Sequence, residues 1–433
     1  MLGQHFLTRH KFNGGHFGQG FLTKTLFLSR RICIVGAKMK KKWASIILLL
    51  VLSSLAVTLP NVGIVKAQST IYIRADGSVK GTNRIQQIGA IYTFTCNVTD
   101  SIIVEMDGIV IDGSGFWLEG TEDETGINLT NRTDVAVKNL NITHFGVGIA
   151  LFNTTCTTLN NNKITNNYGY PASIYLANSS NNILTKNIIE VNLQNALWLR
   201  DFSNNNIVSE NIITQTVTTG INVGGSNNTL SENILDDSQI VLSGECKSNT
   251  VTGNRIANSG VSGIWTLHEN SENTISRNII FGCNVGINLD TSDNIVYENN
   301  LTGNIFGVNF NRGDGNLFCH NNFIDNEEQV TYGYGRYSDA AGVNVWSNQK
   351  EGNYWSNNNG TDNNGDGVGD TPYIIDENNQ DNYPLMNPFI LTPQNLESFP
   401  IIWVITIIGI TATGGIALLI FFKKTKKTRS KVE

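Results

Sequence analysis

An acidic box near the carboxyl end has the composition and spacing of a calcium-binding loop. Residues 362–370 read DNNGDGVGD, so oxygen-bearing residues alternate and a glycine stands where such a loop bends sharply. The predicted ligands are Asp362, Asn364, Asp366, the carbonyl of Val368, and Asp370. The twelfth position is Tyr373 instead of a bidentate Glu, so Asp376, Asp381 or water would complete the shell. The alternative is a solvated acidic turn.

Two pairs of neighbouring residues, Asp236-Asp237 and His268-Glu269, are the candidates for acid–base chemistry on a polysaccharide. Such chemistry needs carboxylates that lie close together on one face. Successive residues of a strand point to opposite faces, so neither pair converges unless it lies in a turn. The sequence therefore assigns no catalytic residue, and it favours a non-enzymatic protein while leaving the question open.

Copper would need His, Cys or Met ligands, and these are few and scattered. The candidate His and Met ligands of the body are His144, His268, His320, Met106 and Met386. No two of them are close in sequence, so the residues alone predict no copper site.

A repeat from Thr157 to Phe323 organises the rest of the chain. Its eight units are 21 to 25 residues apart. Each unit has an anchor residue, an Asn five residues later, and apolar residues two and seven positions after the anchor. The anchors are Thr157, Asn182, Asn206, Asn228, Asn249, Asn273, Asn294 and Asn316. The Asn column is Asn162, Asn187, Asn211, Asn233, Asn254, Asn278, Asn299 and Asn321.

Each unit also contains an alternating apolar pair, such as Ile174 and Leu176, which is typical of a strand. Short strands, turns and this period predict a single-stranded right-handed parallel β-helix with coils of about 22–23 residues. The Asn column is predicted to be a structural ladder, because a carboxamide can both donate to and accept from the backbone at a corner.

The residue between the members of each pair is predicted to face outward. These residues are Ala150, Tyr175, Trp198, Asn222, Val241, Trp265, Asn288 and Asn309. Tyr175, Trp198 and Trp265 are therefore candidate sugar contacts, and Asn288 is expected to be exposed. The alternative is that a loop or the C-terminal module covers them.

The chain ends predict export and anchoring. Three lysines precede an apolar run and a Val-Lys-Ala site, as in a signal peptide, and an uncharged stretch before a basic tail is long enough to span a bilayer. An uncleaved N-terminal anchor and a buried core helix are the respective alternatives. The expected segments are an upstream extension from an early start (1–38), signal peptide (39–67), N-terminal cap and first coil (68–125), β-helix (126–330), C-terminal module (331–390), linker (391–400), transmembrane helix (401–422) and cytoplasmic tail (423–433).

The body between these ends is acidic. The segments before Ala67 and after Phe422 hold 16 of the 30 basic residues but only one of the 36 acidic ones, which leaves a body with net charge −21. Such a surface repels nucleic acid. The body also carries several N-x-S/T sequons, for example at Asn97 and Asn359, so an extracellular body is a potential glycoprotein.

The C-terminal motifs give a more specific comparison. Coils followed by GNYW (352–355), the box D-x-N-x-D-G-x-G-D, TPY (371–373) and DNYPL (381–385) resemble the NosD-like family of right-handed parallel β-helix proteins, over roughly residues 126–390. The resemblance implies a periplasmic copper-binding label and a part in copper-dependent maturation of nitrous oxide reductase. Many family members are instead surface proteins.

Together these features favour a membrane-anchored extracytoplasmic scaffold that binds surface glycans or cell-envelope proteins. The alternatives are a copper-handling accessory factor and a polysaccharide lyase, hydrolase or epimerase.

Overall fold

The computed structural model describes residues 70–391, except for 168, 193, 201, 217–218, 245, 268–269 and 334–341. The expected signal peptide, transmembrane helix, basic tail and upstream extension lie outside these residues, as do His268 and Glu269. Within the described part of the chain, no helix is long and apolar enough to cross a membrane.

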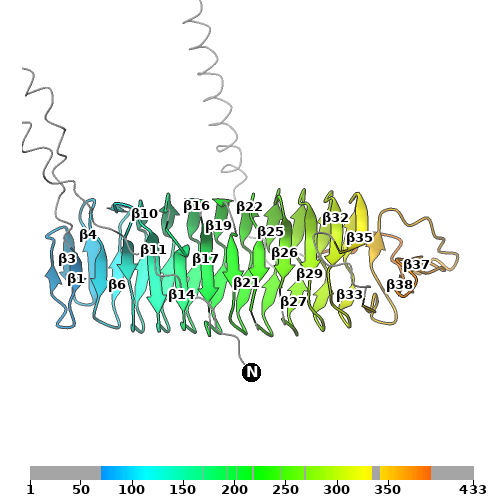
Figure 1. Cartoon of the computed structure of the whole chain (residues 1–433), viewed down its shortest axis with the longest axis horizontal. Helices are drawn as coiled ribbons and strands as arrows, with labels where there is room; N and C mark the ends of the chain where they lie inside the picture. The colour runs from blue at the N-terminus through cyan, green and yellow to red at the C-terminus, as the bar shows by residue number, and fades with distance from the viewer. Residues whose placement is uncertain are drawn as a thin grey trace, which may run out of the picture. The chain divides into compact units, whose positions relative to one another are not determined.

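The described chain winds into a parallel β-helix, in which successive coils add strands to three long sheets (Figure 1). The first sheet runs, in spatial order, β2 (Val79–Lys80), β1 (Ile71–Ile73), β5 (Ile102–Val104), β8 (Thr125–Asn128), β11 (Val147–Phe152), β14 (Ala172–Ala177), β17 (Asn195–Arg200), β20 (Ile221–Val223), β23 (Ile240–Leu242), β26 (Ser262–Thr266), β29 (Val285–Leu289), β32 (Phe306–Phe310) and β35 (Glu328–Tyr332).

The other two long sheets complete each coil. The second sheet runs β7 (Trp117–Glu119), β10 (Asn141–Thr143), β13 (Lys163–Thr165), β16 (Ile188–Asn192), β19 (Ile212–Thr216), β22 (Ile234–Asp236), β25 (Arg255–Ala257), β28 (Ile279–Phe281), β31 (Asn300–Thr302), β34 (Asn322–Ile324) and β36 (Tyr354–Trp355). The third sheet runs β3 (Ile85–Ile88), β4 (Ile91–Phe94), β6 (Val110–Asp112), β9 (Ala136–Lys138), β12 (Thr158–Asn160), β15 (Ile183–Thr185), β18 (Ile207–Ser209), β21 (Thr229–Ser231), β24 (Thr250–Thr252), β27 (Thr274–Ser276), β30 (Ile295–Tyr297) and β33 (Leu317–Cys319).

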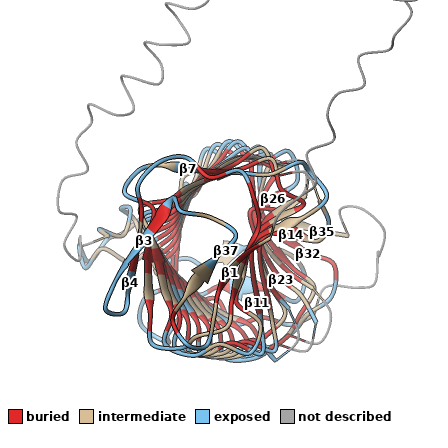
Figure 2. Cartoon of the chain, turned by 90° about the vertical axis from the view of Figure 1, so that its left-hand side faces the viewer, coloured by how far each residue is buried: buried red, intermediate tan, exposed pale blue. Residues whose placement is uncertain are grey.

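The predicted repeat register is confirmed. Ile174 pairs with Leu197 and Leu197 with Ile221 in parallel strands of the first sheet. The two other apolar columns also stack strand upon strand, as Leu159 on Leu184 and Ile164 on Ile189 show. All these side chains are fully buried, and the buried residues line the inner walls when the molecule is viewed along its axis (Figure 2).

The corner between the third and second sheets owes its shape to one left-handed residue per coil. The residue before each Asn of the ladder has a φ near 55°: Asn161, Lys186, Glu210, Glu232, Arg277, Glu298 and His320, with Gly253 in the same place. A single αL residue bends the chain sharply, and its own N–H bonds to the next coil, as from Asn161 N to the carbonyl of Thr185 (3.2 Å). The Asn side chains that follow must satisfy the backbone groups of the corner that remain.

The Asn column does so by bonding along the axis. Asn233 donates from its backbone N and its Nδ2 to the Oδ1 of Asn254 (2.9 Å each), and its Nδ2 also donates to the carbonyl of Val208 (2.9 Å). The same pattern recurs from Asn162 to Asn321. The anchor residues form a second ladder, in which Asn182 donates to Asn206 and Asn206 to Asn228. This second ladder was not predicted from the sequence, where the anchors only marked the repeat.

The C-terminal module covers the last coil with a stack of aromatic rings. Trp355 of β36 lies between Phe323 (centroids 4.2 Å apart) and Tyr373 (4.3 Å), and Trp346 stacks on Phe318 (4.5 Å). Tyr373 belongs to a small hairpin, β37 (Tyr373–Ile374) with β38 (Gln380–Asp381). The GNYW and TPY motifs are therefore parts of a cap over the apolar interior.

Candidate functional site

The outer face of the first sheet carries a cluster of aromatic rings. We call Phe152, Tyr170, Tyr175 and Trp198 the aromatic patch. Tyr175 and Trp198 are register partners on β14 and β17, with ring centroids 5.9 Å apart. Phe152 packs edge-on against Tyr175 at 5.3 Å, and Tyr170 against Trp198 at 6.1 Å. The patch thus extends over three neighbouring strands and an adjoining loop.

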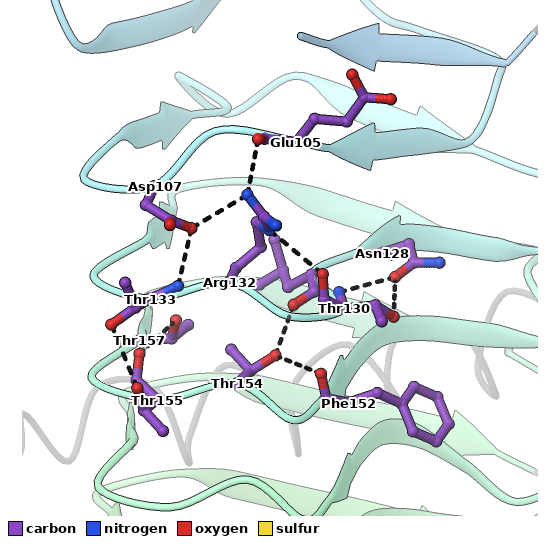
Figure 3. A network of polar contacts seen from close by, with 11 residues as sticks. Glu105, Asp107, Asn128, Thr130, Arg132, Thr133, Phe152, Thr154, Thr155 and Thr157 are labelled. Carbon is purple, nitrogen blue, oxygen red and sulfur yellow. Dashed lines mark hydrogen bonds and ion pairs between the residues drawn. The ribbon is translucent and has the colours of Figure 1, made fainter. Parts of the chain in front are cut away.

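A polar corner fixes the end of the strand that carries Phe152. Figure 3 shows the Phe152 ring projecting away from this corner, where the carbonyl of Phe152 accepts a hydrogen bond from Thr154 Oγ1 (3.1 Å). In the preceding coil, Arg132 Nη1 donates to the carbonyl of Glu105 (2.7 Å) and lies 3.2 Å from Asp107 Oδ1. The Arg132 contacts, and a bond from Thr154 Oγ1 to the carbonyl of Leu129, tie successive coils together, so the ring projects from a rigid support.

The exposed surface of the patch is not where the sequence placed it. Tyr175 is only 7% exposed, whereas Phe152 is 41% and Tyr170 is 71% exposed. Trp198 is half-buried, and the guanidinium of Arg200 lies 5.7 Å from its ring. Sequence reasoning missed Phe152 and Tyr170 because neither occupies the outward position of a strand pair. Phe152 follows its pair directly, which was the available signal.

Trp265 lies apart from the patch. It belongs to β26, and β20 and β23 separate it from β17 in the sheet. Its Nε1 donates to Asp290 Oδ2 at 3.2 Å, so the ring is held by a polar partner. The structure therefore does not bring the three predicted sugar contacts together.

The expectation that Asn288 is exposed is wrong. Asn288 is 5% exposed and its neighbour Asn309 is 0% exposed. Asn309 Nδ2 donates to Asn288 Oδ1 (2.8 Å), and Asn311 Nδ2 donates to the same oxygen (3.2 Å). Outward side chains at identical register lie against each other on adjacent coils, so alternation alone does not make them accessible. Ala150 and Val241 are buried for the same reason.

The acidic box folds as a series of tight turns. Asp362 accepts from the backbone N of Gly365 (2.7 Å) and Gly367 (2.9 Å), and Asp366 Oδ1 accepts from the backbone N of Val368 (2.9 Å). Asn364 Nδ2 donates to Asp366 Oδ2 (3.0 Å). These residues thus share one loop.

Asp370 points towards the start of the loop. Its Oδ2 accepts from the backbone N of Asn363 (2.8 Å) and from Thr361 Oγ1 (3.3 Å). Within residues 70–391 as described, no three His, Cys, Asp or Glu side chains are grouped as a metal ion requires. The calcium site stays a prediction.

The candidate copper ligands lie in separate surroundings. His144 is 3.7 Å from Glu119, and His320 is 2.9 Å from Glu351 and stacks on Phe389. Met106 lies at the N-terminal end, 3.5 Å from the hydroxyl of Tyr92. Among the catalytic candidates, Asp236 accepts from Asn258 Nδ2 (2.7 Å) and Asp237 occupies a left-handed corner. Each of these contacts holds one candidate residue against a neighbouring side chain.

The fold and the comparisons define the class of the protein. Residues 86–235 match the family model described as a right handed beta helix region, which agrees with the coil architecture. Residues 201–360 match the model described as periplasmic copper-binding protein (NosD). With the coil architecture, these two matches support a NosD-like family of right-handed parallel β-helix proteins. No curated protein matches the chain.

Solved structures with similar coils come from proteins of several kinds. The catalytic domain of a GH87 alpha-1,3-glucanase has 13% identity and a TM-score of 0.45, covering 61% of this chain and 63% of the domain. The A-module of the Azotobacter vinelandii mannuronan C-5 epimerase AlgE6 has 11% identity and a TM-score of 0.40, covering 59% of this chain and 88% of the module. At this level the likeness carries no information about activity.

Proposed function

We propose that the protein is an extracytoplasmic β-helix scaffold that binds glycans through the aromatic patch. The observation that carries the proposal is the exposure of Phe152 and Tyr170 around half-buried Trp198. Flat apolar rings with a negative face complement the C–H-rich faces of sugar rings. The family description as periplasmic and the predicted signal peptide support a body outside the cytoplasm.

The rigidity of the patch supports binding. The three strands that carry Phe152, Tyr175 and Trp198 are paired on both sides within the first sheet. A rigid face loses little conformational entropy when a polymer docks on it. The coils also repeat along the axis of the β-helix, as the sugar units repeat along an extended polysaccharide.

Retention on immobilised polysaccharides tests the proposal. We expect Trp198→Ala and Phe152→Ala each to reduce retention of the full chain. The matched control is Ile207→Ala, because Ile207 is also 41% exposed but belongs to β18 of the third sheet. All three variants should unfold cooperatively. Equal retention of the wild type and both patch variants, or no retention on any polysaccharide, would exclude the patch as a glycan site.

A further inference from the structure

An open groove of about 540 Å³ lies on the outside of the first coils, at the corner between the third and second sheets. Its lining comes from four successive coils and combines polar side chains with Gly115 and the apolar Ile188. The lining residues that matter for the argument are Asp112, Ser114, Asn139, Asn141, Asn161 and Lys163. The aromatic patch lies on the first sheet, so the groove is a separate feature.

The groove exists because the first corner is longer than the ones that follow. Four residues, 113–116, separate β6 from β7, whereas two residues separate β9 from β10 and β12 from β13. The longer corner, with Ser114 and Gly115 exposed, forms a raised rim on one side. On the other side Lys186 and Glu210 occupy the left-handed corner position that Asn139 and Asn161 fill in the groove. Short side chains between longer ones leave the hollow.

Hydrogen bonds orient the carboxamides of the groove. Asn161 Nδ2 donates to Asn139 Oδ1 (2.8 Å), and Asn139 Nδ2 donates to Asp112 Oδ1 (3.2 Å). Asn141 Nδ2 donates to the carbonyl of Gly115 (2.6 Å). These bonds use the amide nitrogens, so the carboxamide oxygens of Asn141 and Asn161 are the acceptors left for a ligand. Ser114 Oγ lies beside them and donates to Asp112 Oδ1 (3.4 Å).

The charges of the groove are balanced. Asp112 lies 3.3 Å from Lys138, and Lys163 lies 3.0 Å from Glu190. Hydrogen bonds from Ser114 and Asn139 and the neighbouring Lys138 outweigh burial and lower the pKa of Asp112, so this carboxyl stays an acceptor at neutral pH. A lining with paired charges favours neither a bare anion nor a bare cation, whereas mixed donors and acceptors suit hydroxyl groups, which do both.

We propose that this groove binds a short stretch of neutral glycan. Its volume is within the range of small-molecule sites, roughly 300–1,000 Å³. Its polar side chains suit the hydroxyl groups of a sugar, and the apolar Ile188 beside them suits the C–H groups of a sugar ring. The proposal does not rest on the aromatic patch, because the two features share no residue.

The residues at the equivalent corner of later coils suggest substitutions that would fill the groove without adding backbone strain. Lysine and glutamate already occupy the equivalent left-handed position at Lys186 and Glu210, so Asn161→Lys and Asn161→Glu should both fold. Binding of cellotriose, laminaritriose, maltotriose and mannotriose to the full chain would be measured by saturation-transfer NMR and titration. For a trisaccharide that binds, we expect each variant to weaken binding roughly tenfold or more, from lost hydrogen bonds and lost space.

Two controls separate this site from general effects and from the patch. Glu232→Lys changes the equivalent corner outside the groove and should leave binding unchanged. The Asn161 variants are also compared in a Trp198→Ala background, so that trisaccharide bound at the aromatic patch does not hide a loss at the groove. Failure of the wild type to bind any of the four trisaccharides would overturn the proposal, and so would binding that survives both Asn161 variants in that background. Loss of binding in only one of the two Asn161 variants would show that the groove selects its ligand by charge, which would contradict a neutral ligand.

Discussion

At the scale of single residues, the ladder asparagines contribute more to the stability of the fold than is usual for asparagine, which is mostly a surface residue. Asn233 has no exposed surface, and its Oδ1 accepts from both the backbone N and the Nδ2 of Asn211 (3.0 and 2.9 Å). One carboxamide therefore satisfies two backbone groups of the preceding coil and bonds to the Asn254 side chain of the following coil. A buried polar group that loses its partner costs far more than the average net value of a hydrogen bond.

Asn233→Leu should lower the free energy of unfolding by about 1–3 kcal/mol, since it leaves the carbonyl of Val208 and the backbone N of Asn211 without these partners. Asn160→Leu is the control, because Asn160 lies at an outward, partly exposed position of β12. Its cost should be below about 0.5 kcal/mol. Chemical denaturation of both variants checks this, and equal shifts would contradict the ladder's contribution.

A second residue, Asp381, ends the ladder with a carboxylate. Asp381 Oδ2 accepts from the backbone N of Asn353 (2.7 Å) and from Trp355 Nε1 (2.9 Å), and Oδ1 accepts from the backbone N of Tyr383 (3.0 Å). Burial outweighs these bonds and raises the pKa of Asp381 above its ordinary value. Because the folded state then holds the proton more tightly, this group's stabilising contribution is present at low pH and is lost as pH rises through the folded pKa.

Asp381→Asn keeps an acceptor for Trp355 and removes this titration. We expect the melting temperature of the variant, relative to that of the wild type, to increase as the pH is raised from about 3 to 7. Asp325→Asn, at an exposed corner, is the control, and its melting temperature relative to the wild type should not change in this way. A difference that shrinks with rising pH would mean that the ionised form of Asp381 is the more stabilising one.

At the scale of elements, the coils were predictable and the accessible surface was not. The period, the strand alternation and the Asn column depend on local chemistry that recurs in every repeat, so eight units reinforce one another. The exposure of Tyr175 or Asn288 depends on which side chains the adjacent coils place beside them. That is a contact between residues over twenty positions apart, and neither period nor alternation encodes it.

The C-terminal cap also depends on contacts that the motifs only suggest. GNYW predicts a family, but the sequence does not show that Trp355 fills the end of the solenoid. Gly352 shows why the motif needs glycine, because a Cβ there would lie 1.9 Å from Asp381 Oδ1. The motif residues are therefore explained by packing against a segment about thirty residues later.

The acidic box is the element whose role is most open to experiment. Asp362, Asn364 and Asp366 share one loop, and carboxylates this close repel each other unless a cation or N–H groups compensate. We expect EDTA to lower the melting temperature, with Ca²⁺ restoring it and Cu²⁺ failing to do so. Asp366→Ala should abolish the response, while Asp325→Ala should keep it. An EDTA-insensitive wild type would contradict calcium binding.

At the scale of the whole molecule, the body presents two kinds of surface on different sheets. The aromatic patch belongs to β11, β14 and β17, whereas the groove lies where the third and second sheets meet. An acidic body with two such surfaces suits neutral polymers better than polyanions. The predicted membrane helix at 401–422 would decide where this body is held.

The last described residues fix the point from which a tether would leave. Phe389 donates from its backbone N to Asn322 Oδ1 (2.7 Å), accepts from Asn322 Nδ2 at its carbonyl (2.9 Å), and stacks on His320 with ring centroids 4.4 Å apart. The chain is thus bound to the final full coil at residue 389. Residues between there and the predicted membrane helix at 401–422 are the expected site of proteolytic release.

The mature chain should begin near Gln68 and be held by one C-terminal helix, with its body outside the cell membrane. Protease added to intact cells should release the β-helix and leave a C-terminal epitope tag in the membrane pellet, because the paired strands resist cleavage and the expected linker (391–400) lies outside them. Deletion of residues 401–422 should send the body into the soluble extracytoplasmic fraction. Protection of the body in intact cells, or sedimentation of the deletion variant with membranes, would show that the chain is held in another way.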